Sequence, residues 1–121
     1  MNIALWAAQV LLALAFGMAG AMKLTQPKDK LKTQMAWVED FAPTTIKLIG
    51  ALELLGAIGL IAPLLTGILP WLTPLAAAGL VLTMLGAMAT HLRRHENPML
   101  VVNLVLLLLA AFVAYGRFAL A

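Results

Sequence analysis

Residues 44–62, TTIKLIGALELLGAIGLIA, decide the class of fold, because only two charged residues, Lys47 and Glu53, interrupt this apolar run. A helix of about 20 such residues is long enough to cross the hydrocarbon core of a bilayer. Lys47 lies near one end of the run, where its long side chain can reach the interface, whereas Glu53 lies near the middle. The stretch therefore predicts a membrane-spanning helix with a carboxyl group deep in the membrane.

Three further apolar runs of similar length lie at residues 3–22, 75–92 and 99–116. The chain of 121 residues is 64% hydrophobic and only 11% charged, whereas a soluble domain has roughly 25% charged residues. We therefore expect an all-α polytopic membrane protein, with residues 1–121 forming a single transmembrane domain, a four-transmembrane-helix bundle within the lipid bilayer. A secretory signal peptide is the alternative for residues 3–22. Such a peptide begins with positively charged residues, and no Lys or Arg precedes this run.

The connection between the first two runs, residues 23–43, contains most of the charged residues. Leu31, Met35 and Val38 recur within it at helical spacing, and most of the charged side chains lie off this stripe. This pattern predicts a short interfacial helix between the first two spans, with Trp37 at the depth of the lipid headgroups. A disordered basic loop is the alternative.

The other two connections differ in composition. Residues 63–74 carry no charge, and we expect Pro63, Gly67, Pro70 and Pro74 to keep this segment out of the flanking helices. Residues 93–98, RRHENP, are predicted to form a polar turn between the third and fourth spans.

The distribution of Lys and Arg predicts the orientation of the bundle. Seven of the eight Lys and Arg residues lie in or near the first and third connections, and only Arg117 lies on the other side. The positive-inside rule therefore places these two connections in the cytoplasm and both termini outside, in the inner (plasma) membrane of the cell.

Glu53 is the strongest candidate for a functional residue. A charged side chain at the centre of a bilayer costs at least ~3 kcal/mol on insertion scales, so it is expected to be neutral, paired or hydrated. Its helical face carries small residues, including Gly50 and Gly56, which indicate packing against a neighbouring helix. Two interpretations stay open: a functional carboxyl group, or a protonated one that only bonds the helices together.

Polar residues on the other runs fall at matching depths. If their faces converge, the half of the bundle at the first and third connections has a polar interior, and its members form a candidate ligand-binding set: Glu53, Lys23, Asn103, Thr90 and His91. Lys23 either pairs with Glu53 or extends to the interface. We expect His91 and His95 to be a solvated interfacial pair, because no second helix offers the residues needed to complete a metal site.

Several chemistries are excluded or disfavoured. The chain has no cysteine, so it cannot itself carry out thiol–disulfide exchange or bind an iron–sulfur cluster through thiolates. No phosphate-binding glycine loop and no nucleophile elbow is present, and no enzymatic activity is assigned. The net charge of +3 is explained by membrane topology, so no nucleic-acid partner is expected. No bound metal is expected either, because no second helix offers ligands to complete a site with the two histidines.

The chain resembles the DoxX-like family of small four-helix membrane proteins over nearly its full length. Five segments carry the resemblance through their order and spacing: AGAMKL at 19–24, IGALELLGA at 49–57, GLIAP at 59–63, TPLAA at 73–77 and THLRR at 90–94.

The resemblance implies two classes of function. The family is named for a membrane subunit of an archaeal thiosulfate:quinone oxidoreductase, which implies a redox-associated subunit that binds a quinone or another lipophilic small molecule near Glu53. More distant relatives act as membrane chaperones or cargo receptors, which implies a non-catalytic binding or assembly protein that recruits a protein partner or forms a homo-oligomer. The missing cysteines argue against a direct catalytic role in thiol chemistry.

Overall fold

Four long helices make up most of the protein. Its structure is a computed structural model that describes residues 1–33 and 35–119. The long helices are α1 (Asn2–Thr25), α3 (Pro43–Thr66), α4 (Leu72–Arg93) and α5 (Asn97–Ala119). Each is long and apolar enough to cross a membrane, and at 1.5 Å per residue each reaches the roughly 30 Å of a hydrocarbon core. The predicted all-α fold with four candidate membrane spans is confirmed.

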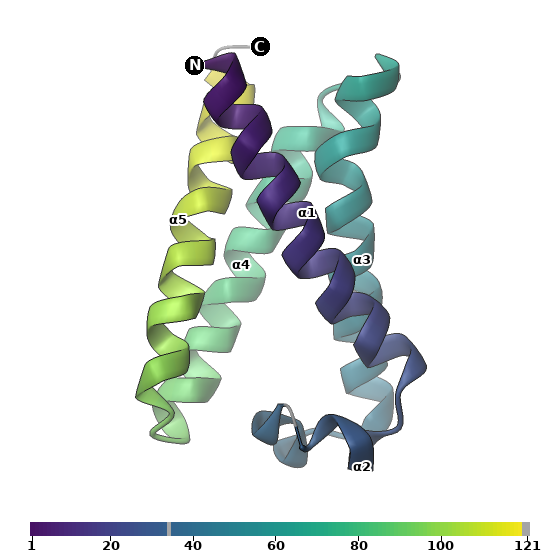
Figure 1. Cartoon of the computed structure of the whole chain (residues 1–121), viewed down its shortest axis with the longest axis vertical. Helices are drawn as coiled ribbons and strands as arrows, with labels where there is room; N and C mark the ends of the chain where they lie inside the picture. Colours follow the sequence, from purple (N-terminus) through teal and green to yellow (C-terminus); the bar gives the residue numbers. More distant parts are fainter. Residues whose placement is uncertain (34, 120–121) are drawn as a thin grey trace.

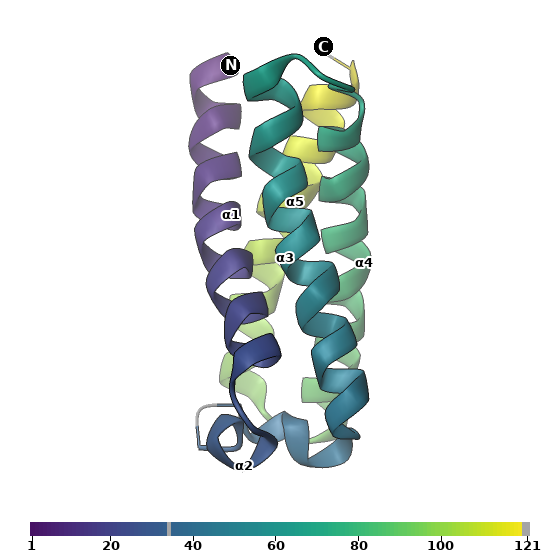
Figure 2. The ribbon, with the colours of Figure 1, turned by 90° about the vertical axis from the view of Figure 1, so that its right-hand side faces the viewer.

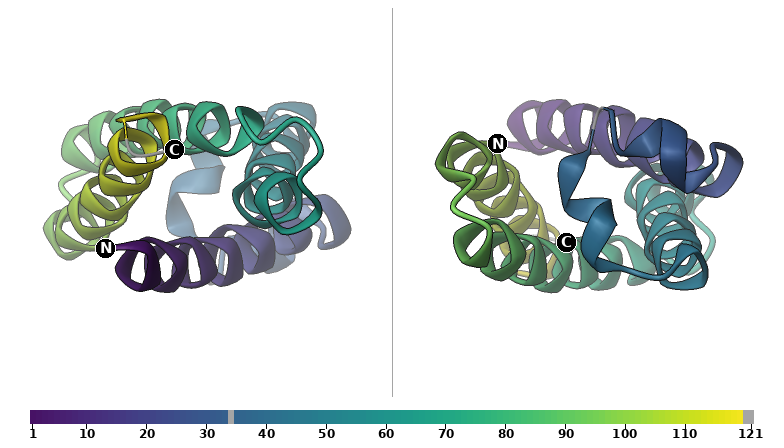
Figure 3. Two further views of the ribbon diagram at one scale, coloured as in Figure 1. Left: turned by 90° about the horizontal axis from the view of Figure 1, so that it is seen from above. Right: turned by 90° about the horizontal axis from the view of Figure 1, so that it is seen from below.

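The helices pack as two pairs, α1 with α3 and α4 with α5. The two pairs contact each other in two places, where α3 meets α4 and where α1 meets α5. Helix α1 begins beside the last turns of α5 and crosses obliquely to end beside α3 (Figure 1). Seen from its ends, the bundle is a ring of four helices (Figure 3). We call the end with residues 26–33, 35–42 and 94–96 the polar end, and the end where α1 begins and α5 stops the terminal end.

The main core lies toward the terminal end and takes side chains from all four long helices. Phe16, Leu12 and Leu60 are its largest fully buried members. The outward faces carry exposed apolar side chains such as Leu55, Leu82 and Leu104. An apolar exterior of this kind is suited to lipid rather than to water.

Helices α3 and α4 extend further than the sequence predicts, and the connection between them shrinks to residues 67–71. Pro63 lies inside α3, where it cannot donate a hydrogen bond to the carbonyl group of Gly59. The Thr73 hydroxyl group, fully buried, donates to this carbonyl oxygen instead, at 2.9 Å. Pro74 falls in the first turn of α4, where no intrahelical donor is needed. The expectation that Pro63 and Pro74 lie outside the helices is therefore wrong.

A short helix between the first two spans is confirmed, although the predicted stripe is split between two pieces. Helix α2 covers Lys28–Leu31, and the 3-10 helix η1 covers Ala36–Asp40. The two are separated by a turn and by Met35, whose φ of −132° and ψ of 81° are not helical. Leu31 and Val38 are nevertheless buried together, against Ile46 of α3. The segment lies across the polar end of the ring (Figures 2 and 3).

Candidate functional site: a cavity at the polar end of the bundle

A cavity of about 420 Å³ occupies the half of the bundle next to the polar end. All four long helices line it, and Met35, Trp37 and Phe41 line it from the segment that crosses the polar end. The five candidate residues of the sequence analysis all line this one cavity: Lys23 from α1, Glu53 from α3, Thr90 and His91 from α4, and Asn103 from α5. The rest of the lining is apolar, apart from Thr83.

Lys23 and Glu53 form an ion pair on the wall of the cavity made by α1 and α3. Lys23 Nζ lies 2.5 Å from Glu53 Oε1, and each side chain is only 5% exposed. The ammonium group also lies 5.4 Å from the centre of the Trp37 ring, within the range of a cation–π contact. Of the two sequence-based interpretations of Lys23, the paired one therefore fits the structure.

Two glycines bring the ion pair together. A Cβ atom added to Gly20 of α1 would lie 2.6 Å from the carbonyl oxygen of Gly50, and one added to Gly50 would lie 2.6 Å from Lys23 Cβ. The backbones of α1 and α3 thus approach as closely as they do only because neither residue has a side chain. Lys23 and Glu53 each follow their glycine by three residues, about one helical turn.

Asn103 lies on α5, a helix that packs against α1 and α4. It is 5% exposed, and its Nδ2 group has no hydrogen-bond partner among the described residues. A buried donor without a partner costs about 1–3 kcal/mol. Its amide is therefore available to bind a hydrogen-bond acceptor in the cavity.

Thr90 and His91 are both engaged with their own chain. The Thr90 hydroxyl group donates to the Gly86 carbonyl oxygen of the same helix, at 3.0 Å. His91 Nδ1 lies 2.8 Å from Glu96 Oε1. His91 is 4% exposed, so the prediction that it forms a solvated pair with His95 is wrong. The chain reverses directly after α4, which buries His91 beneath Glu96 and leaves His95 exposed.

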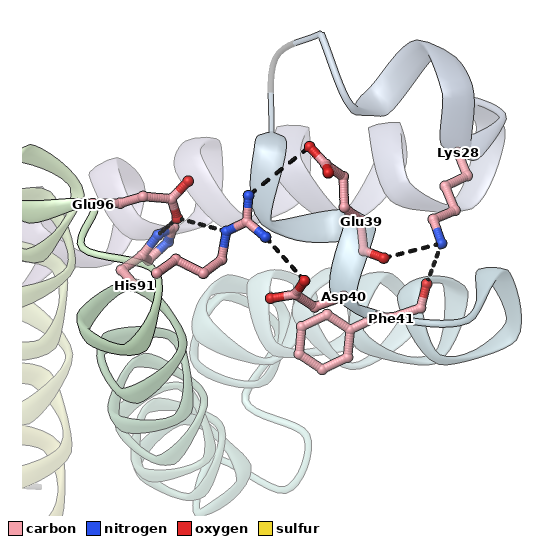
Figure 4. A network of polar contacts seen from close by, with 7 residues as sticks. Lys28, Glu39, Asp40, Phe41, His91 and Glu96 are labelled. Atoms are coloured by element: carbon pink, nitrogen blue, oxygen red, sulfur yellow. Dashed lines mark hydrogen bonds and ion pairs between the residues drawn. The ribbon is translucent and has the colours of Figure 1, made fainter.

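Arg94 connects the turn after α4 to η1 across the polar end through ion pairs with Glu39, Asp40 and Glu96, the three carboxylates labelled in Figure 4. Its guanidinium group lies 3.0 Å from Asp40 Oδ1, 3.9 Å from Glu39 Oε1 and 3.3 Å from Glu96 Oε1. Since η1 carries Trp37, these ion pairs hold one wall of the cavity in place. The sequence does not predict this network, because the segments that bring its members together are far apart in the chain.

The pKa of the Glu96 carboxyl group lies below its ordinary value of 4.5, chiefly because of the hydrogen bond with His91 and then the contacts with Arg94. A carboxyl group whose pKa is lowered by folding contributes stability above its ordinary pKa and loses it as the pH falls through the lowered value. The turn after α4 is therefore expected to loosen in acid, below about pH 4.5.

Replacing Arg94 with glutamine is expected to free the segment that crosses the polar end. Exposed ion pairs contribute little one by one, so we expect amide hydrogen exchange of residues 36–41 to accelerate about threefold at neutral pH. The difference from the wild type should shrink below the ordinary pKa of Glu96, where the wild-type network is itself weakened. Arg93→Gln is the control, because Arg93 is exposed and makes no ion pair with the described residues. Equal exchange in both variants would contradict the role given to Arg94.

A second polar cluster lies at the terminal end, between α1 and α5. Arg117 donates to Gln9 Oε1 and to Asn2 Oδ1, each at 2.7 Å, and its guanidinium group lies 5.4 Å from the Trp6 ring centre. Gln9 in turn donates to the carbonyl oxygen of Leu60 on α3. The cluster ties three helices together, and none of its residues lines the cavity.

Within residues 1–33 and 35–119, no three His, Asp or Glu side chains gather closely enough to hold a metal ion. The polar groups that line the cavity include nitrogen and oxygen atoms of Lys23, Glu53, His91 and Asn103 and the hydroxyl groups of Thr83 and Thr90, in an apolar surround. That arrangement fits an organic ligand with a few polar atoms better than it fits a metal.

The sequence matches the model of one protein family. The DoxX-like family model covers residues 7–113, which include every candidate residue of the cavity. No curated protein and no solved structure matches the chain.

Proposed function

The chain belongs to the DoxX-like family of membrane proteins, and we propose that it is a redox-associated subunit that binds a quinone-like lipophilic ligand in the cavity beside Glu53. The observation that carries this proposal is the buried amide of Asn103, which lines an apolar cavity and has no hydrogen-bond partner among the described residues. A quinone carbonyl oxygen is an acceptor of the kind that this amide lacks.

The size and lining of the cavity support such a ligand. A volume of about 420 Å³ falls within the 300–1,000 Å³ typical of small-molecule sites. Phe16, Trp37 and Phe41 contribute aromatic rings to its lining, and such rings pack well against a flat conjugated ring. The few polar groups would fix the orientation of the ligand, and the apolar remainder would exclude water.

A bound quinone would supply two-electron, two-proton redox chemistry. In this proposal the chain itself orients the ligand and holds protons. Asn103 donates a hydrogen bond to one carbonyl oxygen. The Lys23–Glu53 pair offers a proton on the wall made by α1 and α3, and His91 links the cavity through Glu96 to the polar end.

Asn103→Leu is expected to weaken quinone binding about tenfold, because one hydrogen bond between partners buried in a dry site is worth about 1.4 kcal/mol. The fold should be as stable as the wild type or slightly more so, since the substitution removes an unpaired buried donor. Binding of decylubiquinone would be measured in lipid nanodiscs by quenching of Trp37, in a Trp6→Phe, Trp71→Phe background that leaves Trp37 as the single tryptophan.

Gln9→Leu is the matched control, because it removes another buried amide, one that lies outside the cavity. It should lower stability and leave the affinity of the folded protein unchanged. If decylubiquinone fails to bind the wild-type bundle, the quinone proposal is wrong. A stable complex with a protein partner and no lipophilic ligand would then favour the binding or assembly role.

The orientation of the bundle is also a proposal. The Lys and Arg bias would place the polar end, and with it the cavity, on the cytoplasmic side of the plasma membrane. Cysteines introduced at Lys30 and Asn97 should then resist an impermeant thiol reagent in intact cells, and one at Leu69 should react. Because the natural chain has no cysteine, every signal comes from the introduced residue. The reverse labelling pattern would overturn this orientation.

A further inference from the structure

A second cavity lies in the crevice between α3 and α4, on the side of the bundle that faces lipid. Its volume is about 790 Å³, and Gly59, Ala76 and Gly79 are among the small residues that line it. Its lining overlaps that of the first cavity at Leu52, Leu82 and Thr83. Leu52 and Leu82 are 57% and 69% exposed, so two of the residues that the cavities share lie at the surface of the bundle.

We propose that the gap at Leu52, Leu82 and Thr83 is a lateral portal, and that the crevice beyond it, called here the tail groove, holds the hydrocarbon tail of the ligand whose head group lies beside Glu53. This inference rests on the proposed function and narrows the ligand class. The ligand is then an amphiphile with a polar head group the size of one ring and a linear apolar tail.

The chemistry of the tail groove fits a hydrocarbon and not a polar head. Its hydroxyl groups belong to Thr66 and Thr83, and both donate within their own helix, to Ala62 and to Gly79. Hydrogen-bonding groups that are free to bind a ligand are thus concentrated on the Glu53 side of the portal. The tail groove offers a ligand only apolar contacts. Along α4 it runs from Leu82 to Leu72, about 15 Å by helical rise.

The portal also gives a route of entry that needs no passage through water. A lipophilic molecule dissolved in the bilayer would reach the surface at Leu52 and Leu82 directly. At Gly79 the tail groove is shaped by a missing side chain, because a Cβ atom added there would meet nothing within 4 Å. A side chain added at this position therefore starts in open space, and a bulky one is expected to extend into the tail groove.

The test compares two probes that share one head group, decylubiquinone and the same quinone ring without a tail. Affinities are measured by Trp37 quenching in phosphatidylcholine nanodiscs and expressed as mole fraction in the lipid. Lipid is as apolar as the tail groove, so the tail gains only by packing. We expect decylubiquinone to bind about tenfold more tightly than the tail-less ring, and Gly79→Phe to abolish this difference without changing the affinity for the tail-less ring.

Ala78→Phe is the matched control, since Ala78 is the neighbouring residue on α4, is exposed and lines neither cavity. The Ala78→Phe variant should still bind decylubiquinone about tenfold more tightly than the tail-less ring. Equal affinity of the two probes for the wild type would overturn the tail groove and leave the proposed function standing. The tail groove would also be overturned, with the proposed function left standing, if Gly79→Phe weakened the binding of both probes equally or of neither. Failure of both probes to bind would overturn the proposed function, and this inference with it.

Discussion

Replacing Gly20 with alanine is expected to destabilise the bundle by about 2–3 kcal/mol, the upper part of the range for overpacking. The added Cβ would lie 2.6 Å from the carbonyl oxygen of Gly50 and 2.8 Å from the backbone nitrogen of Leu54. Both atoms belong to the backbone of α3, so no side-chain rotation can relieve the clash. Helices α1 and α3 must then separate, and this also pulls Lys23 away from Glu53.

The measurement is the free energy of unfolding in mixed micelles, titrated with a denaturing detergent and followed by circular dichroism. Gly86→Ala is the matched control, because a Cβ atom at Gly86 would meet nothing within 4 Å. Alanine also favours a helix over glycine by roughly 1 kcal/mol, so this variant should be neutral or slightly stabilised. If Gly20→Ala is as stable as Gly86→Ala, close backbone contact does not hold α1 against α3.

The number and type of the helices follow from the sequence because a membrane removes most alternatives. A long apolar run must satisfy its backbone groups internally, and a helix is the local solution. The helix boundaries do not follow in the same way. Pro63 is a strong local signal for a helix end, and Thr73, ten residues later, compensates for it by binding the carbonyl group of Gly59. A contact of this kind exists only once α3 and α4 have packed.

The candidate residues of the cavity were predictable for a related reason. Polar side chains are costly in lipid, so Glu53 and Asn103 were expected to face the interior, whereas Lys23 was expected either to pair with Glu53 or to extend to the interface. All three line one cavity. The position of each residue along its predicted helix also indicated that these side chains lie at the same depth, near the polar end. The burial of His91 and the bridge made by Arg94 could not be found in this way, because both depend on how the turn after α4 folds against the segment that crosses the polar end.

Glu53→Leu is expected to destabilise the bundle by about 3–5 kcal/mol, because it leaves the Lys23 ammonium group buried without its counter-charge. Had Glu53 no charged partner, the same substitution would be neutral or stabilising. The double variant Lys23→Met, Glu53→Leu removes both charges and keeps similar volumes. Replacing a whole buried ion pair with apolar residues is often neutral or stabilising, so the double variant should recover most of the lost stability.

This cycle of variants separates the structural role of the pair from a functional one. Unfolding in mixed micelles of the wild type, of Glu53→Leu and Lys23→Met alone, and of the double variant gives the coupling energy between Lys23 and Glu53. A coupling energy near zero would mean that the ion pair contributes nothing. Quinone binding is then measured on the folded double variant alone, where stability no longer confounds the result. If the carboxyl group takes part in binding, the double variant is stable and its affinity for decylubiquinone falls at least about tenfold. A stable double variant with wild-type affinity would reduce Glu53 to a structural contact, and the function of the cavity would then depend on Asn103 and the aromatic residues of its lining.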